Sequence, residues 1–235
     1  MSLLVTPIVL RDAVTRDSDI ATLLLAAMDE QGESVIDGDV IVVTSKVVAK
    51  AEGRVVAFDG TDEAKFALIE SESRRILRRR GTLRITETHH GFVNANAGVD
   101  LSNTEPGTAV LLPTDPDRSA RRLRATLRRR RGVDVGVVIT DTFGRAWRHG
   151  VTDVAIGAAG LRAVLDLRGT VDATGRTLEA TEVAIADEIA GAANLVLGKA
   201  AGTPFARLRG LDPTYFGDGS VARDIIRPVN GDLFR

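Results

Sequence analysis

The sequence predicts a mixed α/β domain in which strands and helices alternate irregularly. Short apolar runs of strand length occur at Val40–Val43, Thr108–Leu112 and Val135–Ile139. The segments between them carry apolar residues at helical spacing. There is no GxGxxG motif after a strand and no GxxxxGK(S/T) motif. The fingerprints of Rossmann and Walker folds are therefore absent, and we do not expect a doubly wound sheet.

Length and composition limit the classes of protein to which this chain can belong. A chain of 235 residues is long enough for a substantial core, and it has no internal repeat or low-complexity linker. Basic and acidic residues number 31 and 32, so no global charge attracts nucleic acid. Without cysteine, disulfides and thiolate chemistry are excluded. No apolar run reaches the roughly 20 residues that span a bilayer, and the first residues lack a signal-peptide pattern. We expect a cytoplasmic protein without a membrane or nucleic-acid partner.

The elements of the first half each have a local signal. A helix over Asp17–Gly32 begins at good capping residues and keeps its apolar side chains on one face. An Asp-Gly turn precedes the strand Val40–Val43. Asp62–Arg80 is expected to be a second helix, whose arginines favour its carboxyl end. Strands over Leu83–Thr86 and Thr108–Leu112 follow.

The second half continues with a helix over Asp117–Arg131 that leads into the strand before Asp141. A hairpin turn is expected at Asp172–Gly175. The helix Glu179–Leu197 has a broad apolar face. A strand over Phe205–Leu208 and a short helix or turn over Ala222–Ile226 complete the chain.

Two arginine runs, at 74–80 and 121–131, lie in segments that we expect to be helical. No aromatic residues are interleaved with them in a way that would stack bases. We therefore interpret both runs as solvated helix faces and not as a nucleic-acid groove.

The stretch Ile139–Gly160 is the main candidate for a site. Asp141 and Thr142 stand at the expected carboxyl end of a buried strand, and Arg145 and Arg148 follow on a loop bounded by glycines. A carboxylate, a hydroxyl and two guanidinium groups suit a metal ion and an anionic oxygen. The alternative is a polar turn between two core strands.

A second polar stretch, Thr86–Asn103, contains Asp100 together with two histidines and three asparagines. Such a density of polar groups is uncommon without a function, although a hydrogen-bonded surface loop would also explain it. The adjacent His89 and His90 make a poor zinc site, because no third histidine is near. We expect them to contact an anion or to satisfy backbone groups.

Two further segments could contact phosphate. Ser45, Lys46 and Lys50 follow the strand Val40–Val43, where lysines act as point charges. Their alternative is a solvent-facing helix start. The glycine-flanked segment Gly198–Pro204 could cradle phosphates, or simply end a helix.

These residues together suit a metal-dependent nucleotide enzyme that lacks the usual phosphate loop. Asp100, Asp141 and Thr142 supply hard oxygen ligands for magnesium or manganese. Such an ion bridges phosphates and spreads the charge of a phosphoryl group in transit. The lysines and arginines named above would neutralise the remaining negative charge, which makes Asp141, Arg145 and Arg148 the candidate catalytic residues.

The sequence resembles the coenzyme F420-0:L-glutamate ligase (gamma-glutamyl ligase) family, from about Asp39 to Pro204, in four stretches: TSKVVAKAEG, HGFVNANAGVDLSN, ITDTFGRAWRHGVTDVAIGAAG and EVAIADEIAGAANLVLGKAAGTP. It looks especially like the amino-terminal ligase domain of the actinobacterial enzymes. The resemblance implies an unusual mixed α/β fold that forms an intertwined homodimer. It also implies that GTP activates the terminal carboxylate of F420-0 as an acyl phosphate. L-glutamate then displaces phosphate to form an amide, and further glutamates join through gamma linkages.

The resemblance also implies roles for individual residues. It places Asp100, Asp141 and Thr142 at the positions of metal ligands, for Mg2+ or Mn2+, with K+ as a further candidate ion. The nucleotide-contacting positions are those of Ser45, Lys46, Lys50, Asn103 and, in the loop Val196–Thr203, of Val196, Gly198, Lys199, Gly202 and Thr203.

The chain departs from the family pattern in three places. Val9–Ala13 lacks the usual Gly-Leu-Pro segment that touches the nucleotide. Lys199 stands where many archaeal members have a glutamate or glutamine that holds a second metal. The chain stops at Arg235, so we expect a single ligase domain over residues 1–235 and a flavin-binding domain only as a separate partner. Two alternatives stay open: a ligase for a different acid, and a nucleotide-binding subunit without turnover.

Overall fold

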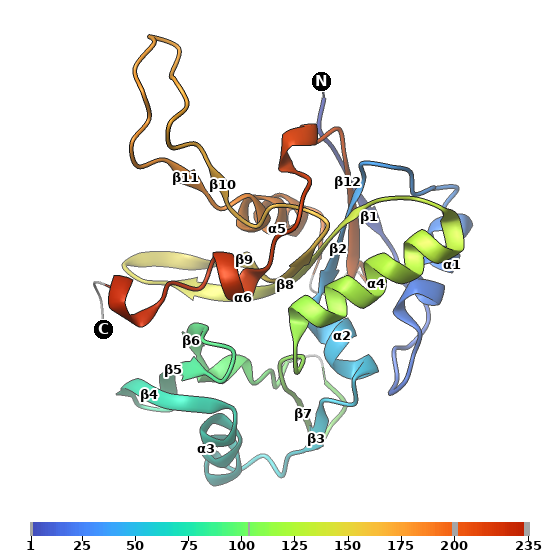
Figure 1. The fold of residues 1–235 in the computed structure, drawn as a ribbon. Coiled ribbons are helices and arrows are strands. Elements are labelled where there is room, and N and C mark those ends of the chain that lie inside the picture. The colour runs from blue at the N-terminus through green and yellow to red at the C-terminus, as the bar shows by residue number, and fades with distance from the viewer. Residues whose placement is uncertain (1, 103, 199–201, 233–235) are drawn as a thin grey trace.

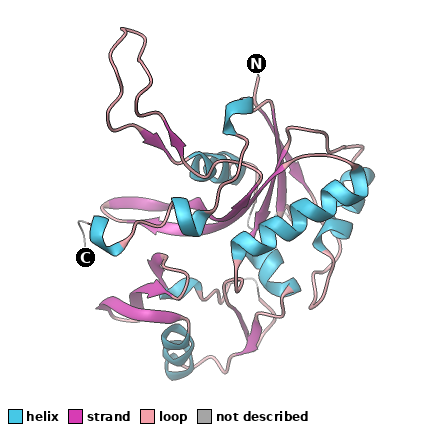
Figure 2. Cartoon of the chain, in the orientation of Figure 1, coloured by secondary structure: helices cyan, strands magenta, loops and turns pink. Residues whose placement is uncertain are grey.

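The computed structural model describes residues 2–102, 104–198 and 202–232. Its centre is a five-stranded mixed sheet in which β2 and β8 are parallel and the other neighbours are antiparallel. The strand order is β1 (Leu4–Ile8), β12 (Phe205–Arg209), β2 (Val40–Thr44), β8 (Gly136–Arg145) and β9 (Arg148–Ala159). The mixed α/β class expected from the sequence is confirmed (Figures 1 and 2).

The core lies between this sheet and three helices: α1 (Ile20–Glu30), α4 (Pro116–Arg131) and α5 (Ile185–Asn194). Strand β2 and the first part of β8, Val137–Ile139, are continuous apolar runs, as expected for strands covered on both faces. Both α4 and α5 pack on β8 and β9. Gly157 of β9 is required by close packing, because a Cβ atom there would lie 2.4 Å from the carbonyl carbon of Pro116.

A second group of elements lies below the central sheet in Figure 1. It contains the helices α2 (Ser45–Ala51) and α3 (Asp62–Ser71) and the 3-10 turn η1 (Asn96–Gly98). Its two small antiparallel sheets are β3 (Val55–Ala57) with β7 (Thr108–Val110), and β4 (Ser73–Arg80) with β5 (Leu83–Thr88) and β6 (Val93–Ala95).

The remaining elements are short. β10 (Leu165–Asp166) pairs with β11 (Glu182–Val183) at the base of a long arm that projects from the body (Figure 1). The carboxyl-terminal part holds η2 (Pro213–Tyr215), α6 (Val221–Asp224) and η3 (Val229–Gly231). No helix in the described ranges has both the length and the apolar character needed to cross a membrane.

Most predicted elements are confirmed with shifted ends, but the helix expected over Asp62–Arg80 is wrong in its second half. The helix α3 ends at Ser71, and the arginine run continues as β4, an edge strand. Pairing with β5 and the ion pairs of Arg74 and Arg75 with Glu87 override the helical preference of arginine. The arginine run at 121–131 is helical as expected.

Two other expectations need correction. The glycine-bounded loop expected in Ile139–Gly160 is a long β-hairpin, in which only Ala146 and Trp147 separate β8 from β9. The helix expected over Glu179–Leu197 begins only at Ile185, since Glu182 and Val183 pair with β10. The short strands β1, β3 and β6 were not predicted. The homodimer stays a prediction.

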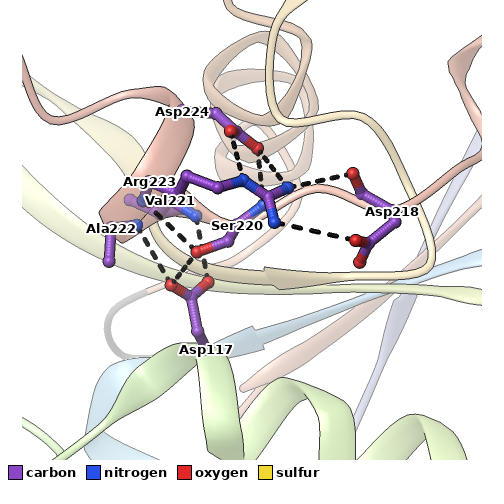
Figure 3. Close-up of polar contacts among 7 residues, drawn as sticks. All are labelled: Asp117, Asp218, Ser220, Val221, Ala222, Arg223 and Asp224. Atoms are coloured by element: carbon purple, nitrogen blue, oxygen red, sulfur yellow. Dashed lines mark hydrogen bonds and ion pairs between the residues drawn. The ribbon is translucent and has the colours of Figure 1, made fainter.

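The carboxylate of Asp117 joins α4 to α6 (Figure 3) and also to β9. It is 5% exposed. Its Oδ1 accepts from the backbone N–H groups of Ala158 (2.8 Å) and Val221 (3.0 Å). Its Oδ2 accepts from the Ser220 hydroxyl (2.7 Å) and the Ala222 N–H (3.0 Å). One buried charge thus satisfies the start of α6 and fixes the chain end against the core.

We expect Asp117→Ala to lower the free energy of unfolding by about 3 kcal/mol, because four donors lose an acceptor of full charge. Urea unfolding followed by circular dichroism measures the change. The matched control is Asp218→Ala, whose side chain is 96% exposed and should change stability by less than about 0.5 kcal/mol. Equal stability of the two variants would contradict this role of Asp117.

Candidate active site

The carboxyl end of β2 and the middle of β8 border a cavity of about 540 Å³. Its wall is completed by α2, the segment after η1, part of β9, the end of α5 and residues 10–14. Polar side chains dominate its chemistry: Asp12, Ser45, Lys46, Lys50, Asp100, Ser102, Thr140, Asp141, Thr142, Asp153, Asn194 and Thr203. The two aspartates singled out from the sequence, Asp100 and Asp141, both lie in this wall.

Asp141 is held in the wall by strand pairing. Thr44 of β2 is aligned with Thr140 of β8, so the residues that follow them, Ser45 and Asp141, are neighbours. The Ser45 hydroxyl donates to Asp141 Oδ1 at 2.7 Å. Burial raises the pKa of Asp141 to about 6, and the charges of Asp153 and Asp100 also raise it, although hydrogen bonds from Ser45 and the Thr142 N–H oppose the shift.

Asp153 is a site residue that our sequence reasoning missed. It lies opposite Thr142 in the β8–β9 hairpin and is 5% exposed. The Thr142 hydroxyl donates its only proton to Asp153 Oδ1 at 2.7 Å, which leaves the lone pairs of the hydroxyl oxygen as acceptors. The available signal was a carboxylate next to the apolar run Val154–Gly160, where a strand covered on both faces is expected.

Asp100 lines the same cavity from the segment after η1. Its Oδ2 lies 2.8 Å from Lys46 Nζ, and its Oδ1 accepts from the N–H and the hydroxyl of Ser102. Burial alone would raise the pKa of Asp100, but the hydrogen bonds from Lys46 and Ser102 and the Lys46 charge outweigh it, so the pKa is lowered. Lys46 also donates to the Ser102 carbonyl at 2.7 Å. The lysine therefore ties α2 to the segment after η1.

The predicted nucleotide contacts divide into three groups. Ser45, Lys46, Lys50, Gly198, Gly202 and Thr203 line the cavity. Val196 lies behind it, where its carbonyl accepts from the Thr203 hydroxyl (3.4 Å), which in turn accepts from the Gly198 N–H (2.9 Å). Asn103 and Lys199 fall outside the described residues. Lys50 makes no ion pair or hydrogen bond with the described part of the chain, so its ammonium group is available to a ligand.

The structure does not bring Arg145 and Arg148 into this cavity. Both lie at the exposed tip of the β8–β9 hairpin, where Arg145 donates to the His149 carbonyl at 2.9 Å. His89 and His90 contact backbone carbonyls, as expected: Ser71 for the first and Pro113 for the second. The segment without the Gly-Leu-Pro pattern does line the cavity, through Leu10, Asp12, Ala13 and Val14.

The carboxylate oxygens in the cavity wall fit a divalent cation that is bound together with a phosphate. Among the described residues, no three His, Cys, Asp or Glu side chains form a group that would hold a metal by themselves. Asp141 and Asp153 are nevertheless poorly exposed, and no described lysine, arginine or histidine lies within ion-pair distance of either. Buried carboxylates without a cation are costly. Magnesium is commonly held by one or two carboxylates plus substrate phosphates, which matches this wall.

Comparison with known proteins gives a consistent result along almost the whole chain. The profile of the family described as F420-0:Gamma-glutamyl ligase matches residues 9–210. A protein of Methanopyrus kandleri named Coenzyme F420:L-glutamate ligase is 42% identical, over 100% of this chain and 98% of its own length. Proteins of the same name from Methanothermobacter thermautotrophicus and Halobacterium salinarum are each 40% identical, over 92% and 90% of this chain and 92% and 89% of their own lengths.

We expect Asp141→Asn to stabilise the metal-free protein at pH 8 by on the order of 2 kcal/mol. The raised pKa of Asp141, about 6, means that its ionisation destabilises the folded state. This penalty is absent below the unfolded pKa of about 4 and complete above about 6. Asparagine keeps the acceptor for Ser45 but carries no charge.

Urea unfolding in the presence of a chelator, from pH 4.5 to pH 8, measures this effect. The wild-type protein should lose stability relative to the variant as the pH rises from about 4 to about 6, so the difference should be smallest at pH 4.5 and level off above about pH 6. Asp218→Asn, at an exposed carboxylate, is the control and should follow the wild type. Parallel curves for wild type and Asp141→Asn would show that the charge of Asp141 is not penalised.

Proposed function

The chain belongs to the F420-0:gamma-glutamyl ligase family, and from this membership and the cavity we propose that it joins L-glutamate to F420-0 through an amide bond, with GTP as the source of activation. The observation that carries the proposal is the pair of poorly exposed carboxylates, Asp141 and Asp153, which have no basic partner among the described residues and line one cavity together with Lys46 and Lys50. A site of this kind suits the triphosphate of a nucleotide with its cation.

The proposed reaction has two steps. A carboxylate oxygen of F420-0 attacks the terminal phosphorus of GTP, which gives an acyl phosphate and releases GDP. The amine of L-glutamate then attacks the acyl carbon, phosphate leaves with the electrons of the C–O bond, and the nitrogen loses a proton. Repetition on the product would add further glutamates through gamma linkages. The names of the relatives support the overall joining of glutamate, and the cavity supports the use of a nucleotide.

The side chains of the cavity have distinct tasks in this proposal. Lys50, which is not engaged by other described residues, would bind phosphate oxygens directly. Lys46 is held in place by Asp100 and the Ser102 carbonyl, so it presents a fixed positive charge. The glycines at 198 and 202 leave room for the phosphates beside Thr203. All three features position the phosphoryl group, which is the main requirement for its transfer.

Mg2+ or Mn2+ would be held by Asp141, Thr142 and Asp100, which line the same cavity. The ion would offset phosphate charge and align the phosphoryl group with the incoming carboxylate. Asp153 would act as a positioning residue, because its hydrogen bond turns the lone pairs of Thr142 toward a cation. K+, the homodimer and a separate flavin-binding partner remain predictions.

A different acceptor acid is the second candidate. It is motivated by the amino-terminal segment, which lines the cavity with Leu10, Asp12, Ala13 and Val14 instead of a Gly-Leu-Pro sequence. The additional carboxylate of Asp12 would repel some acids and accept hydrogen bonds from others. Under this alternative, the nucleotide chemistry is the same and only the acceptor changes.

Incubation of the protein with F420-0, GTP, L-glutamate and Mn2+, followed by mass spectrometry, tests the proposal. We expect glutamylated product and GDP, and a loss of at least about a thousandfold in rate for Asp141→Asn, as expected when a metal charge is removed from a phosphoryl-transfer site. GTP turnover only with another acid would support the second candidate. Nucleotide binding without turnover would indicate a nucleotide-binding subunit. Near-wild-type rates for Asp141→Asn would exclude a catalytic role for Asp141.

The role of Asp153 predicts a separate effect on metal affinity. We expect Asp153→Asn to weaken Mn2+ binding about 10- to 100-fold, because an amide can donate to Thr142 and turn the hydroxyl proton toward the cation. Electron paramagnetic resonance of free Mn2+ in the presence of GDP measures this affinity. Thr142→Val should weaken binding to a similar degree, and the double variant should add little. Unchanged Mn2+ affinity in Asp153→Asn would contradict the positioning role.

A further inference from the structure

The three-stranded sheet β4–β5–β6 concentrates positive charge. Its strands contain six arginines and one glutamate, whereas the formal net charge of the whole chain is −1. The arginines are Arg74, Arg75, Arg78, Arg79, Arg80 and Arg84. Five of them belong to β4, which is an edge strand. The charge is therefore a local feature of this sheet and not a property of the whole surface.

The two faces of the sheet have different environments. Helix α3 packs on one face, where the guanidinium carbon of Arg84 lies 4.0 Å above the ring of Phe66 and Thr86 is fully buried. Arg79 is aligned with Arg84 and so belongs to this face. A bulge at Leu77 shifts the register, so that Arg78 is aligned with Ile85 and Arg80 with Leu83 on the opposite face.

This opposite face continues directly into the wall of the active-site cavity. Ile85 is aligned with Ala95 of β6, and Ala95 lines the cavity. A single row across the sheet thus runs from Ala95 through Ile85 to Arg78. Adjacent strands are about 4.8 Å apart, which places the backbone of Arg78 roughly 10 Å from the cavity wall. Ala95 and Arg78 are exposed and Ile85 is partly exposed, so the row is open to solvent.

The arginines nearest to this row lack acidic partners. Arg74 and Arg75 pair with Glu87. In the described part of the chain, no carboxylate lies within ion-pair distance of Arg78, Arg79 or Arg80. Arg78 Nη1 donates to its neighbour's carbonyl, that of Leu77, at 2.8 Å, which leaves the other guanidinium donors available. Guanidinium groups in this state are suited to carboxylates, which they bind with two parallel hydrogen bonds.

We propose that this open face, defined by Arg78, Arg80, Ile85 and Ala95, binds the oligo-γ-glutamate tail of an acceptor that already carries glutamates. The inference rests on the proposed function. A gamma linkage leaves the α-carboxylate of every added unit free, so each turnover adds a negative charge to the tail. With the growing end in the cavity, the earlier units extend outward. An extended γ-linked unit spans roughly 6 Å, scaled from the length of an ordinary residue, so the second unit reaches Arg78.

The double variant Arg78→Gln/Arg80→Gln tests the proposal, with Arg79→Gln as the matched control. The control removes one positive charge from the same strand, against two in the double variant, and it does so on the face that α3 covers. The first measurement is KM for acceptors with zero, one and two glutamates. We expect the double variant to raise KM for the diglutamyl acceptor about tenfold, with smaller increases for shorter tails. Arg79→Gln should remain within about twofold of the wild type.

The second measurement does not depend on turnover. Isothermal titration with a γ-linked triglutamate peptide, at low and at physiological ionic strength, reports tail binding directly. We expect the double variant to bind about tenfold more weakly than Arg79→Gln at low ionic strength, and the difference to shrink as salt is added. Absence of product with the wild-type enzyme would reject the proposed function, while this titration would still test the face.

Three results would overturn the tail-binding role. The first is a triglutamate affinity in the double variant equal to that of the wild type. The second is an equal loss in Arg79→Gln, which would indicate only general electrostatic attraction. The third is a change in oligomeric state of the double variant by analytical ultracentrifugation, which would assign the face to contacts between copies of the chain. Circular dichroism confirms folding, which these exposed substitutions should not disturb.

Discussion

The parallel pairing of β2 with β8 is the constraint on which the active site depends. Thr44 and Thr140 are aligned, and from this point β2 turns into α2 while β8 continues into its hairpin. The divergence of the two chains opens the cavity and leaves Ser45 hydrogen bonded to Asp141 at its edge. Ligand sites lie at the carboxyl ends of parallel strands for this reason, since neighbouring strands separate there and expose their backbone and side chains.

Carboxylates with little exposure to water are the second feature that defines the site. Asp141 has a raised pKa because it is buried and close to two other carboxylates. Asp117, by contrast, is buried but accepts four hydrogen bonds and supports the fold. The difference in hydrogen bonding separates a structural carboxylate from one that is suited to a cation. In the proposed reaction, a divalent ion and its phosphates supply the partner that the described residues do not.

The smaller sheet gives the molecule a second electrostatic region beside the first. The charged residues that line the cavity are aspartates and two lysines, whereas the charged residues in the strands of the sheet are almost all arginines. Ala95 belongs to both, so a ligand that leaves the cavity along this wall would move from the proposed nucleotide-binding environment to one that favours carboxylates. Such a sequence of environments suits an acceptor that gains one charge with each added glutamate.

Much of this protein was determined by its sequence alone. Local signals were sufficient for α1 and α4 and for the apolar strands, because capping and periodicity act over a few positions. Unusual polarity also singled out Asp100, Asp141, Thr142, Ser45 and the two lysines, all of which line one cavity. The family resemblance also required only the order of residues.

Only the tertiary structure decided which of those residues meet. Residues 74–80 form a strand because β5 offers a partner, and no local preference encodes that pairing. Asp153 joined the site because the hairpin aligns it with Thr142, while the same hairpin carried Arg145 and Arg148 out to its exposed tip. Register and side-chain burial depend on contacts between residues that are distant in sequence, and these contacts exist only in the folded chain.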